Sequence, residues 1–346
     1  MRLSWEEVDG RCRRALGALG YGETAAAVIS GHLVAAEAGG LPALGIARLA
    51  WIAEVLDAGA PRGDPSTLDD GHPAVIVDGH GGIGYPAVER ALSVALARLP
   101  QAGVVVIGVR QVFLTGVLRS YASSLAVRGV ASILTSSAAP AVVASGRGGR
   151  SVLGTNPLCI GVPAGPRPLL FDTGSTTVSY SELRARQSAG RPLADGAGID
   201  AEGLPTTDPA AVLDGGALLP WAGHRGFGLA AAVQALGMLV GAPPTPSALD
   251  DCGLFGVLVD PTVFGFADAT TKGVATLAAA LSEAAPPVSV TRLPGERWCT
   301  RQEYARRAGL DLNPAAMRLL ADIDARGPIS SDSGTAPRKF GGDHTR

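Results

Sequence analysis

Polar side chains that can hold a ligand gather where one short apolar run ends. Residues 158–162 and 169–171 are apolar and bounded by Pro and Gly, which predicts two buried strands. The second run continues into Asp172-Thr173-Gly174-Ser175-Thr176. A carboxylate can accept hydrogen bonds from hydroxyl groups, while hydroxyls and bare backbone N–H groups can contact phosphate. The same five residues suit an ordinary turn, so the stretch predicts a ligand-binding sheet edge or a structural turn.

A glycine motif earlier in the chain is a second candidate for nucleotide binding. Gly79, Gly81 and Gly84 spell G-x-G-x-x-G between an apolar run and a helical pattern, and the next predicted strand covers residues 103–109. This is the order of a Rossmann dinucleotide fingerprint. Arg110, however, stands where an acidic residue would hold the ribose, and Tyr85-Pro86 interrupts the turn into the helix. Because 47 of the 346 residues are Gly, a chance match is the alternative.

The elements that must position these residues alternate between helices and strands. Ser4 with Glu7 predicts a capping box at the first helix. The apolar window 226–243 is short for a membrane span and predicts a buried helix. The apolar periodicity predicts further helices over about 23–38, 44–58, 118–127, 272–285 and 301–325, and strands over 131–135 and 254–259.

Composition narrows the class of protein. A chain of 346 residues that is 47% hydrophobic can bury a large core, and its length suggests about two domains. The net charge of −2 without a basic block argues against nucleic acid or a membrane surface as partner. The four cysteines are scattered, and the N-terminus has no apolar core of a signal peptide. We therefore expect reduced thiols and a cytoplasmic location.

Six motifs in order resemble the malate/L-lactate dehydrogenase family of NAD(P)-dependent oxidoreductases, which lack the Rossmann fold. That family includes sulfolactate and ureidoglycolate dehydrogenases and Δ1-piperideine-2-carboxylate reductase. The motifs are Asp78-Gly79, Gly154-Thr155-Asn156-Pro157, Phe171-Asp172, residues 204–209, residues 223–228 and Pro294-Gly295-Glu296. They cover residues from about 5 to 325. In that family the glycine turn after Asp78 is structural, so the resemblance implies that the Rossmann-like motif is not a nucleotide site.

The resemblance implies an α/β homodimer with a mixed sheet, a discontinuous NAD(P)-binding domain and a helical substrate and dimer domain. Residues 1–60, about 111–165 and 300–326 would form the substrate and dimerisation domain. Residues from about 61 to 110 and 166–299 would form the NAD(P)-binding domain. Residues 327–346 are polar and are expected to be a disordered tail.

The resemblance also nominates a site for NAD or NADP. Its residues would be Ser137, Asp172, Thr173, Gly174, His224, Arg225, Gly295 and Glu296. Physical chemistry agrees, since Asp172 can accept ribose hydroxyls and Arg225 supplies a permanent positive charge. The family has Lys at position 225, but the chain contains only two Lys against 27 Arg, so the exchange need not change the function. Asp172 as a structural cap and His224 as a turn residue are the alternatives.

The departures from the family pattern concern the catalytic residues. The family reads Ser-His-Gly where this chain has Ala43-Leu44-Gly45, although Arg48 three residues later is kept. A second family His, the general acid/base, is replaced by Leu114. Leu cannot transfer a proton. Arg48 is still expected to bind a substrate carboxylate, with a surface helix Arg as the alternative.

These departures lead to two hypotheses about function. A ketone needs a proton as its oxygen gains charge, whereas a cyclic iminium already carries its proton. The first hypothesis is therefore an NAD(P)H-dependent reductase of a small imine or ketone that carries a carboxylate. Leu44 and Leu114 would make its substrate pocket more apolar. His80 and Tyr121 could provide a substitute proton path. The second is a family member without redox chemistry that catalyses a cyclisation or isomerisation, or binds a partner.

Overall fold

The computed structural model describes residues 2–68, 74–145, 149–165, 167–284, 292–312 and 314–326; the predicted tail lies outside them. Its N-terminal part is helical, as expected. The capping box is confirmed, because Glu7 N donates to Ser4 Oγ (3.1 Å) and Ser4 N donates to Glu7 Oε2 (2.8 Å). The elements are α1 (Trp5–Ala18), α2 (Glu23–Ala38), the 3-10 turn η1 (Pro42–Leu44) and α3 (Arg48–Asp57).

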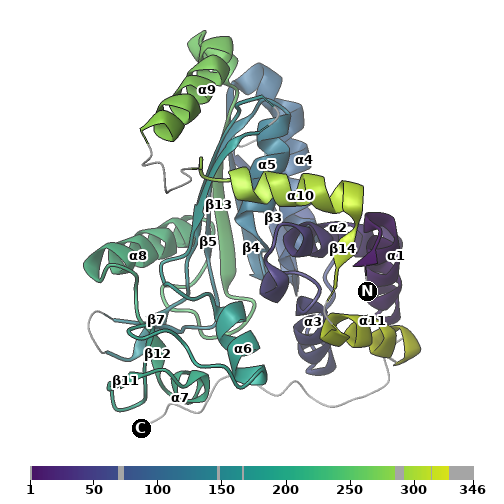
Figure 1. The fold of residues 1–346 in the computed structure, drawn as a ribbon, viewed down its shortest axis with the longest axis vertical. Helices are drawn as coiled ribbons and strands as arrows, with labels where there is room; N and C mark the ends of the chain where they lie inside the picture. Colours follow the sequence, from purple (N-terminus) through teal and green to yellow (C-terminus); the bar gives the residue numbers. More distant parts are fainter. Residues whose placement is uncertain are drawn as a thin grey trace.

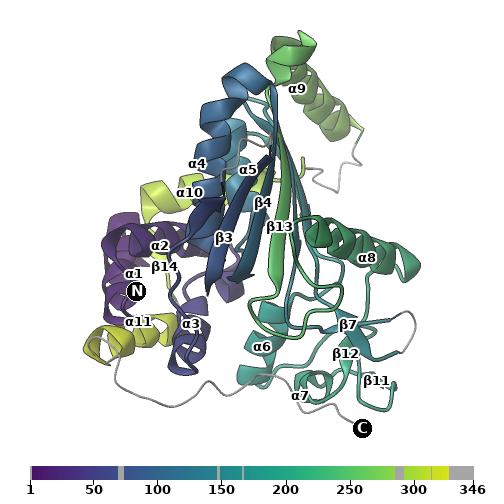
Figure 2. The same cartoon turned by 180° about the vertical axis from the view of Figure 1, so that it is seen from behind.

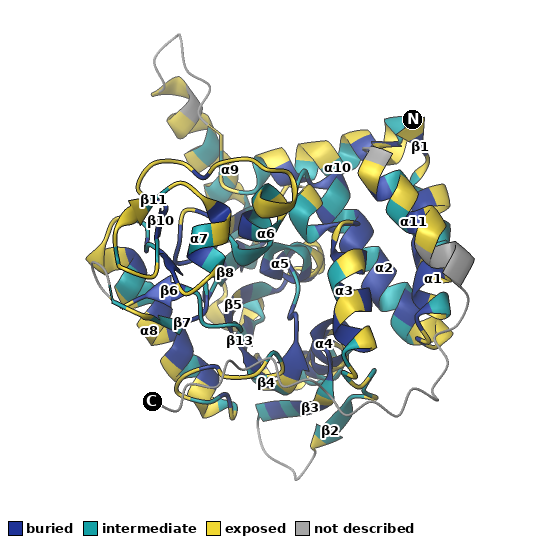
Figure 3. Ribbon diagram, turned by 90° about the horizontal axis from the view of Figure 1, so that it is seen from below, coloured by how far each residue is buried: buried dark blue, intermediate teal, exposed yellow. Residues whose placement is uncertain are grey.

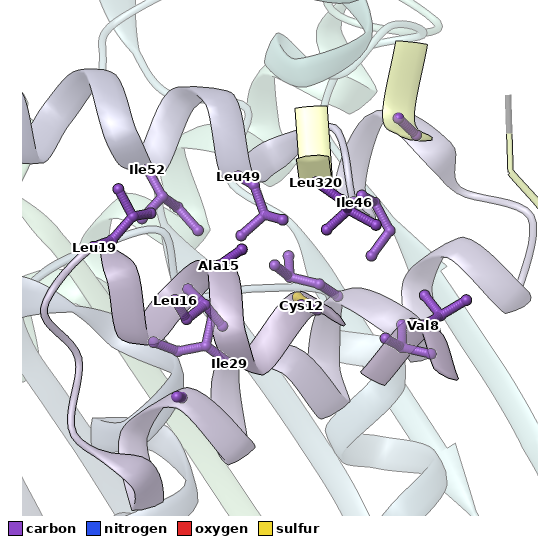
Figure 4. Close-up of a cluster of buried hydrophobic side chains, with 14 of the residues drawn as sticks. Val8, Cys12, Ala15, Leu16, Leu19, Ile29, Ile46, Leu49, Ile52 and Leu320 are labelled. Carbon is purple, nitrogen blue, oxygen red and sulfur yellow. The ribbon is translucent and has the colours of Figure 1, made fainter. Parts of the chain in front are cut away.

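These helices share an apolar core with the end of the chain (Figure 4). Val8 and Leu16 of α1 pack with Ile29 of α2 and Leu49 of α3, and Leu320 of α11 (Pro314–Arg326) closes the cluster. Residues 301–325 were predicted as one helical region, but α10 (Glu296–Ala308) ends at a glycine with φ +82°. A two-residue pairing of β1 (Arg2–Leu3) with β14 (Leu310–Asp311) then separates α10 from α11.

The centre of the molecule is a seven-stranded mixed sheet (Figure 1). Its order is β2 (Ser66–Leu68), β3 (Ala74–Ile83), β4 (Val104–Phe113), β13 (Cys252–Val259), β5 (Ala131–Ser137), β8 (Leu158–Val162) and β9 (Leu169–Thr173). The neighbours β3 and β4 are parallel, and the other pairs are antiparallel. This confirms the expected mixed α/β fold.

Helices cover the two faces of this sheet unequally (Figure 2). Helices α4 (Gly84–Ala102) and α5 (Leu118–Val127) bury one face, and α8 (His224–Leu239) packs on part of the other. The prediction of a buried helix was wrong for the outer side of α8, where Leu239 is 73% exposed (Figure 3). Its buried side consists of Gly226, Ala230, Val233, Gln234 and Gly237. The prediction of two buried strands was also wrong for β9, an edge strand whose Phe171 is 43% exposed.

A second, smaller sheet lies beside the end of the large one (Figure 1). The strand order of this smaller sheet is β11 (Pro205–Thr206), β10 (Gly198–Ile199), β12 (Ala217–Leu218), β6 (Val143–Ala144) and β7 (Ser151–Leu153). Helices α6 (Tyr180–Ser188) and α7 (Pro209–Leu213) accompany it, while the 3-10 turn η2 (Pro261–Phe264) and α9 (Ala267–Glu283) follow β13. Within the described residues, no helix combines the length and apolarity needed to cross a membrane.

The G-x-G-x-x-G segment is part of a strand rather than a phosphate-binding turn. Strand β3 runs through it to Ile83, with a shift of register between Asp78 and Gly82. Helix α4 then begins at Gly84, where a Cβ would lie 3.0 Å from the Leu114 carbonyl oxygen, and Tyr85 is fully buried. Because protein atoms cover this helix start, a pyrophosphate has no room to approach its N–H groups. The Rossmann alternative was wrong.

The large sheet draws on both of the domains expected from the sequence. Strands β3, β4, β9 and β13 come largely from the ranges assigned to the cofactor domain, whereas β5 and β8 come from the range 111–165 assigned to the substrate domain. The hydrogen bonds of β5 to β13 and of β8 to β9 join these ranges continuously. The proposed division into domains therefore does not follow the boundaries of the sheet.

A buried histidine joins the N-terminal helices to the helices that cover the large sheet. His32 of α2 stacks on Tyr85 with ring centroids 4.6 Å apart, and its Nε2 accepts a hydrogen bond from Val117 N at 2.7 Å. Burial, with a smaller contribution from the Arg48 charge, lowers the pKa of His32 from 6.5 to about 3. The folded protein therefore holds this imidazole neutral, because protonation would remove the acceptor and bury a charge.

This low pKa predicts a loss of stability in mild acid. Below pH 6.5 the unfolded chain binds a proton at His32 that the folded protein does not, so the free energy of unfolding falls by about 1.4 kcal/mol per pH unit toward pH 3. His32→Gln keeps an acceptor for Val117 N but does not titrate. Urea unfolding should show that lowering the pH from 7 to 5 decreases the free energy of unfolding of the wild type by about 2 kcal/mol more than that of the variant. A pH-independent difference would contradict the assignment, and the exposed His224→Asn serves as control.

Candidate substrate and cofactor site

Leu44 and Leu114, which the sequence comparison predicts to stand at the family's histidine positions, line one small cavity. The cavity measures about 90 Å³, and its wall includes Leu44 from η1, Leu114 from the end of β4 and Arg48 from the start of α3. Trp51 and Tyr180 complete its apolar side. The chain thus brings together three sequence-nominated residues that are up to 70 positions apart.

Local backbone geometry presents Leu114 to this cavity. Leu114 has φ +55°, which is uncommon for a residue with a side chain, and it stands between β4 and α5. Gly116 follows with φ +93°, and a Cβ there would lie 2.5 Å from Tyr85 and 2.7 Å from His32 Nε2. The turn can therefore close only over a glycine, and His32 holds it in place through Val117 N.

Arg48 supplies an unpaired positive charge to the cavity. Its Nη1 donates to Tyr85 Oη and its Nη2 donates to Ser181 Oγ, both at 3.0 Å. Only 9% of the residue is exposed, and Nε is buried without a hydrogen-bond partner. No carboxylate of the described residues pairs with it. A buried guanidinium with free donors is costly unless an anion neutralises it, so this geometry suits a bound carboxylate.

Among the described lining residues there is no His, Asp or Glu that could exchange a proton with a substrate. The titratable groups other than Arg48 are Tyr180 and Cys252. Burial raises the pKa of the Tyr180 phenol and raises that of the Cys252 thiol to about 11, so both remain protonated at neutral pH.

The two substitute proton donors considered from the sequence lie outside this cavity. Tyr121 is buried and donates to the Thr115 carbonyl oxygen at 3.0 Å. The His80 Nε2 lies 2.8 Å from Ser66 Oγ, and its Nδ1 lies 3.4 Å from Asp78 Oδ1. Neither residue is part of the cavity wall.

A short hydrogen-bonded path connects the cavity to the predicted cofactor segment. Thr155 lines the cavity, and its carbonyl oxygen accepts from both Ser175 N and Ser175 Oγ at 2.8 Å. On the far side, Trp221 N donates to the Ser175 carbonyl oxygen and Trp221 Nε1 donates to that of Gly174 at 2.7 Å. Helix α8 starts three residues later, so the exposed His224 and Arg225 stand beside the Gly174 turn.

Arg119 of α5 contacts both the carboxylate and the carbonyl oxygen of Asp172. Arg119 Nε lies 3.5 Å from Asp172 Oδ2, and Arg119 Nη2 donates to the Asp172 carbonyl oxygen at 3.2 Å. Burial raises the pKa of Asp172, and the Arg119 charge opposes that shift. Sequence reasoning missed Arg119, because a lone Arg in an apolar helix carries no pattern that links it to a residue 53 positions away.

The remaining nominated residues differ in how accessible they are. Gly295 has φ +93° and precedes α10, and Leu170 N donates to the neighbouring Pro294 carbonyl oxygen at 2.9 Å, which places Glu296 beside β9. Thr173 Oγ1 donates to the Gly174 carbonyl oxygen. Ser137 is only 1% exposed, and its hydroxyl both donates to and accepts from the Gly253 backbone. The Ser137 side chain is thus fully satisfied inside the protein.

The similarity to known proteins extends over nearly the whole chain. The model of the malate/L-lactate dehydrogenase family matches residues 3–321. The chain is 32% identical to a Δ1-pyrroline-2-carboxylate reductase of Ancylobacter novellus, over 96% of this chain and 99% of that one. It is 27% identical to a Δ1-pyrroline-2-carboxylate/Δ1-piperideine-2-carboxylate reductase of Pseudomonas putida, over 93% and 97%.

Solved structures show the same fold. A Δ1-piperideine-2-carboxylate reductase from Pseudomonas syringae superimposes with a TM-score of 0.82 and 26% identity, covering 93% of this chain and 99% of that one. A malate dehydrogenase from Entamoeba histolytica superimposes with a TM-score of 0.86 and 21% identity, covering 94% and 97%.

Proposed function

Because this chain belongs to the malate/L-lactate dehydrogenase family, we propose that it is an NAD(P)H-dependent reductase of a small cyclic imine that carries a carboxylate. The observation that carries the proposal is the pocket itself. It combines the buried, unpaired Arg48 with an apolar wall at Leu44 and Leu114 and has no imidazole or carboxylate among its described residues. The pyrroline- and piperideine-carboxylate reductases among the relatives support the same choice.

The residues of the pocket suit an iminium better than a ketone. A reduced nicotinamide would supply the hydride for the electrophilic carbon of the C=N bond, and the electron pair of that bond would pass to the nitrogen. The iminium nitrogen already bears its proton, so the product amine forms without an acid from the protein. Arg48 binds the carboxylate and fixes the ring, while Leu44 and Leu114 exclude water from the reacting carbon.

The described residues near β9 suit a dinucleotide. Arg225 is exposed and has no side-chain partner among the described residues, so its charge is free for a phosphate. A Cβ at Gly174 would meet no atom closer than 3.5 Å, which leaves room for a ligand against the backbone. We place the cofactor against Asp172, Thr173, Gly174, His224, Arg225, Gly295 and Glu296, with Ser137 supporting the site from inside.

Four further features complete the proposal, the last of them the domain division. The protein acts in the cytoplasm, forms a homodimer and uses NADH or NADPH as the reductant. The free state of all four cysteines agrees with a reducing compartment. The division into a cofactor-binding domain and a substrate and dimerisation domain remains part of the proposal. The strands of the large sheet come from both domains.

Nucleotide binding is the first test. Titration of NADH and NADPH against the protein's tryptophan fluorescence should show at least one dissociation constant below about 1 mM. Arg225→Gln should weaken that nucleotide about tenfold, because a charge-assisted contact is lost. The matched control is Arg186→Gln, which removes a pair with Glu182 and a hydrogen bond from Nη1 to the Pro192 carbonyl oxygen, contacts that involve no nominated nucleotide residue. If neither nucleotide binds, the reductase proposal fails.

The lack of His, Asp and Glu in the described pocket wall also motivates the alternative, a non-redox reaction in the same pocket. Substrate panels separate the two functions. Cyclic imino acids should be reduced in preference to 2-keto acids, and equal turnover of keto acids would refute the iminium argument. Conversion of an imine that proceeds without consumption of NADH or NADPH would favour the alternative.

A further inference from the structure

A second, larger cavity lies directly behind the wall of the substrate pocket. It measures about 850 Å³ and is formed by α3, α6 and α11, elements that lie together near the bottom of Figure 1. Arg48, Trp51 and Ser181 line both cavities. The two spaces therefore meet at a rim made of these three side chains. We call the larger one the basin.

The basin has an excess of positive charge. Its charged wall residues are Arg48, Arg184, Arg191, Arg318 and Glu54. Arg184 pairs with Glu54 at 2.7 Å, which leaves Arg48, Arg191 and Arg318 without a carboxylate partner among the described residues. The whole chain carries a net charge of −2, so this local surplus is not a property of the surface in general. Three unpaired guanidinium groups around one cavity favour an anionic occupant.

Apart from Ser181 and Ser188, the rest of the wall is apolar. It consists of Trp51, Leu319 and several alanines, most of them from α3, α6 and α11. The Trp51 ring meets Tyr180 edge to face, with centroids 5.7 Å apart, and carries the Arg184 guanidinium 5.4 Å from its own centroid. The two aromatic rings therefore form a fixed surface at the rim. An occupant with an apolar body and an anionic end matches this lining.

The unpaired atom at the rim connects the two cavities. Arg48 is nine-tenths buried, and its Nε has no hydrogen-bond partner although the other two nitrogens each have one. A ligand that neutralises Arg48 must lie at this rim. Beyond the rim the substrate pocket offers only about 90 Å³, whereas the basin is roughly nine times larger. Any substituent of the ligand that does not fit the small pocket has room in the basin.

We infer that the basin is a specificity subsite for the substrate: the imine ring and its carboxylate occupy the small pocket, and an apolar arm ending in a second carboxylate extends into the basin toward Arg191 and Arg318. This inference rests on the proposed function and narrows its substrate class to cyclic imine carboxylates with an anionic arm. Relatives named for pyrroline and piperideine carboxylates act on rings without such an arm.

Three planar acids test the subsite by isothermal titration calorimetry, without nucleotide and without turnover. The diacid 5-(4-carboxyphenyl)pyridine-2-carboxylate contains ring, first carboxylate, arm and second carboxylate. The acid 5-phenylpyridine-2-carboxylate lacks the second carboxylate, and 4-(pyridin-3-yl)benzoate lacks the first. The diacid should bind about fivefold tighter than 5-phenylpyridine-2-carboxylate, a modest factor because Arg191 and Arg318 are exposed.

Matched variants locate the effect. Arg191→Gln and Arg318→Gln should each remove most of the advantage of the diacid and leave 5-phenylpyridine-2-carboxylate unchanged. The control Arg128→Gln, an exposed residue that ends α5 and does not line the basin, should change neither acid. An advantage that survives both basin variants, or a diacid that binds no better than 5-phenylpyridine-2-carboxylate, overturns the subsite.

The third acid separates this inference from the proposed function. If 4-(pyridin-3-yl)benzoate binds in a manner that depends on Arg191 and Arg318 while 5-phenylpyridine-2-carboxylate does not bind at all, the subsite stands and the proposed carboxylate role of the small pocket fails. If none of the three acids binds, both fail.

Discussion

Replacing Leu114 with His is expected to raise the turnover of 2-keto acids about 10²-fold, because a positioned general acid is worth about 10²–10⁴ in rate. Leu114 lines the substrate pocket and has φ +55°. His tolerates this backbone region better than Leu does, so the exchange should not strain the turn. Turnover of cyclic imines should change little, because the iminium brings its own proton. Steady-state kinetics with both substrate classes measures the difference.

The control for this experiment is Leu114→Asn. Asn is close to His in polarity and also tolerates positive φ, but it cannot transfer a proton at neutral pH. It should leave keto-acid turnover near the wild-type value. The gain in the His variant should follow the titration of an imidazole between about pH 5 and 8. An equal gain in the Asn variant would show that polarity rather than acid catalysis is responsible.

Replacing Arg48 with Gln is expected to weaken the binding of carboxylate substrates by about 10²-fold or more. Loss of one partner of a buried, hydrogen-bonded charge pair costs about 2–5 kcal/mol, and every 1.4 kcal/mol is a factor of about ten. Arg48→Lys should recover only part of the affinity, because a single ammonium cannot present two donors in the fixed plane of a guanidinium. Calorimetry with pyridine-2-carboxylate measures binding independently of turnover.

Two measurements separate this role of Arg48 from a purely structural one. Arg48 also donates to Tyr85 and Ser181, so the variants should first be compared by thermal unfolding. Their affinity for the nucleotide should equal that of the wild type, since no nominated cofactor residue contacts Arg48. Joint loss of nucleotide and carboxylate affinity would mean that Arg48 supports the fold of the site rather than the substrate.

Much of the local structure could be predicted from the sequence because short-range rules decide it. The strand Leu158–Val162 and the helix Leu118–Val127 were predicted with the bounds that the structure has. Ser4 and Glu7 form their capping box because both partners lie within one turn of helix. Predictions failed where neighbouring elements decide burial. Phe171 is exposed because β9 is the edge of the sheet, a position that the apolar run itself cannot reveal.

For the site, too, local motifs predicted some residues and only the tertiary structure showed others. Asp172, Arg48 and the replaced histidine positions were nominated from motifs, and the structure places Leu44, Leu114 and Arg48 in one wall. It also shows what motifs could not: Arg119 against Asp172, and His32 behind the Leu114 turn. These contacts join residues 53 and 85 positions apart. Single side chains of ordinary type in apolar helices leave no sequence signal of such pairing.

The sequence by itself determined the family and the types of most elements, because local residue types and their order decide both. It also led to the prediction that positions 44 and 114 lack the proton-transferring side chains of the family. Only the tertiary structure decided whether other side chains replace them. It directs Tyr121 and His80 into hydrogen bonds elsewhere and leaves Arg48 unpaired at the rim of two cavities. The reason is physical: whether a charge is buried and partnered depends on the packing of α3, α4 and α6 together, which no single segment contains.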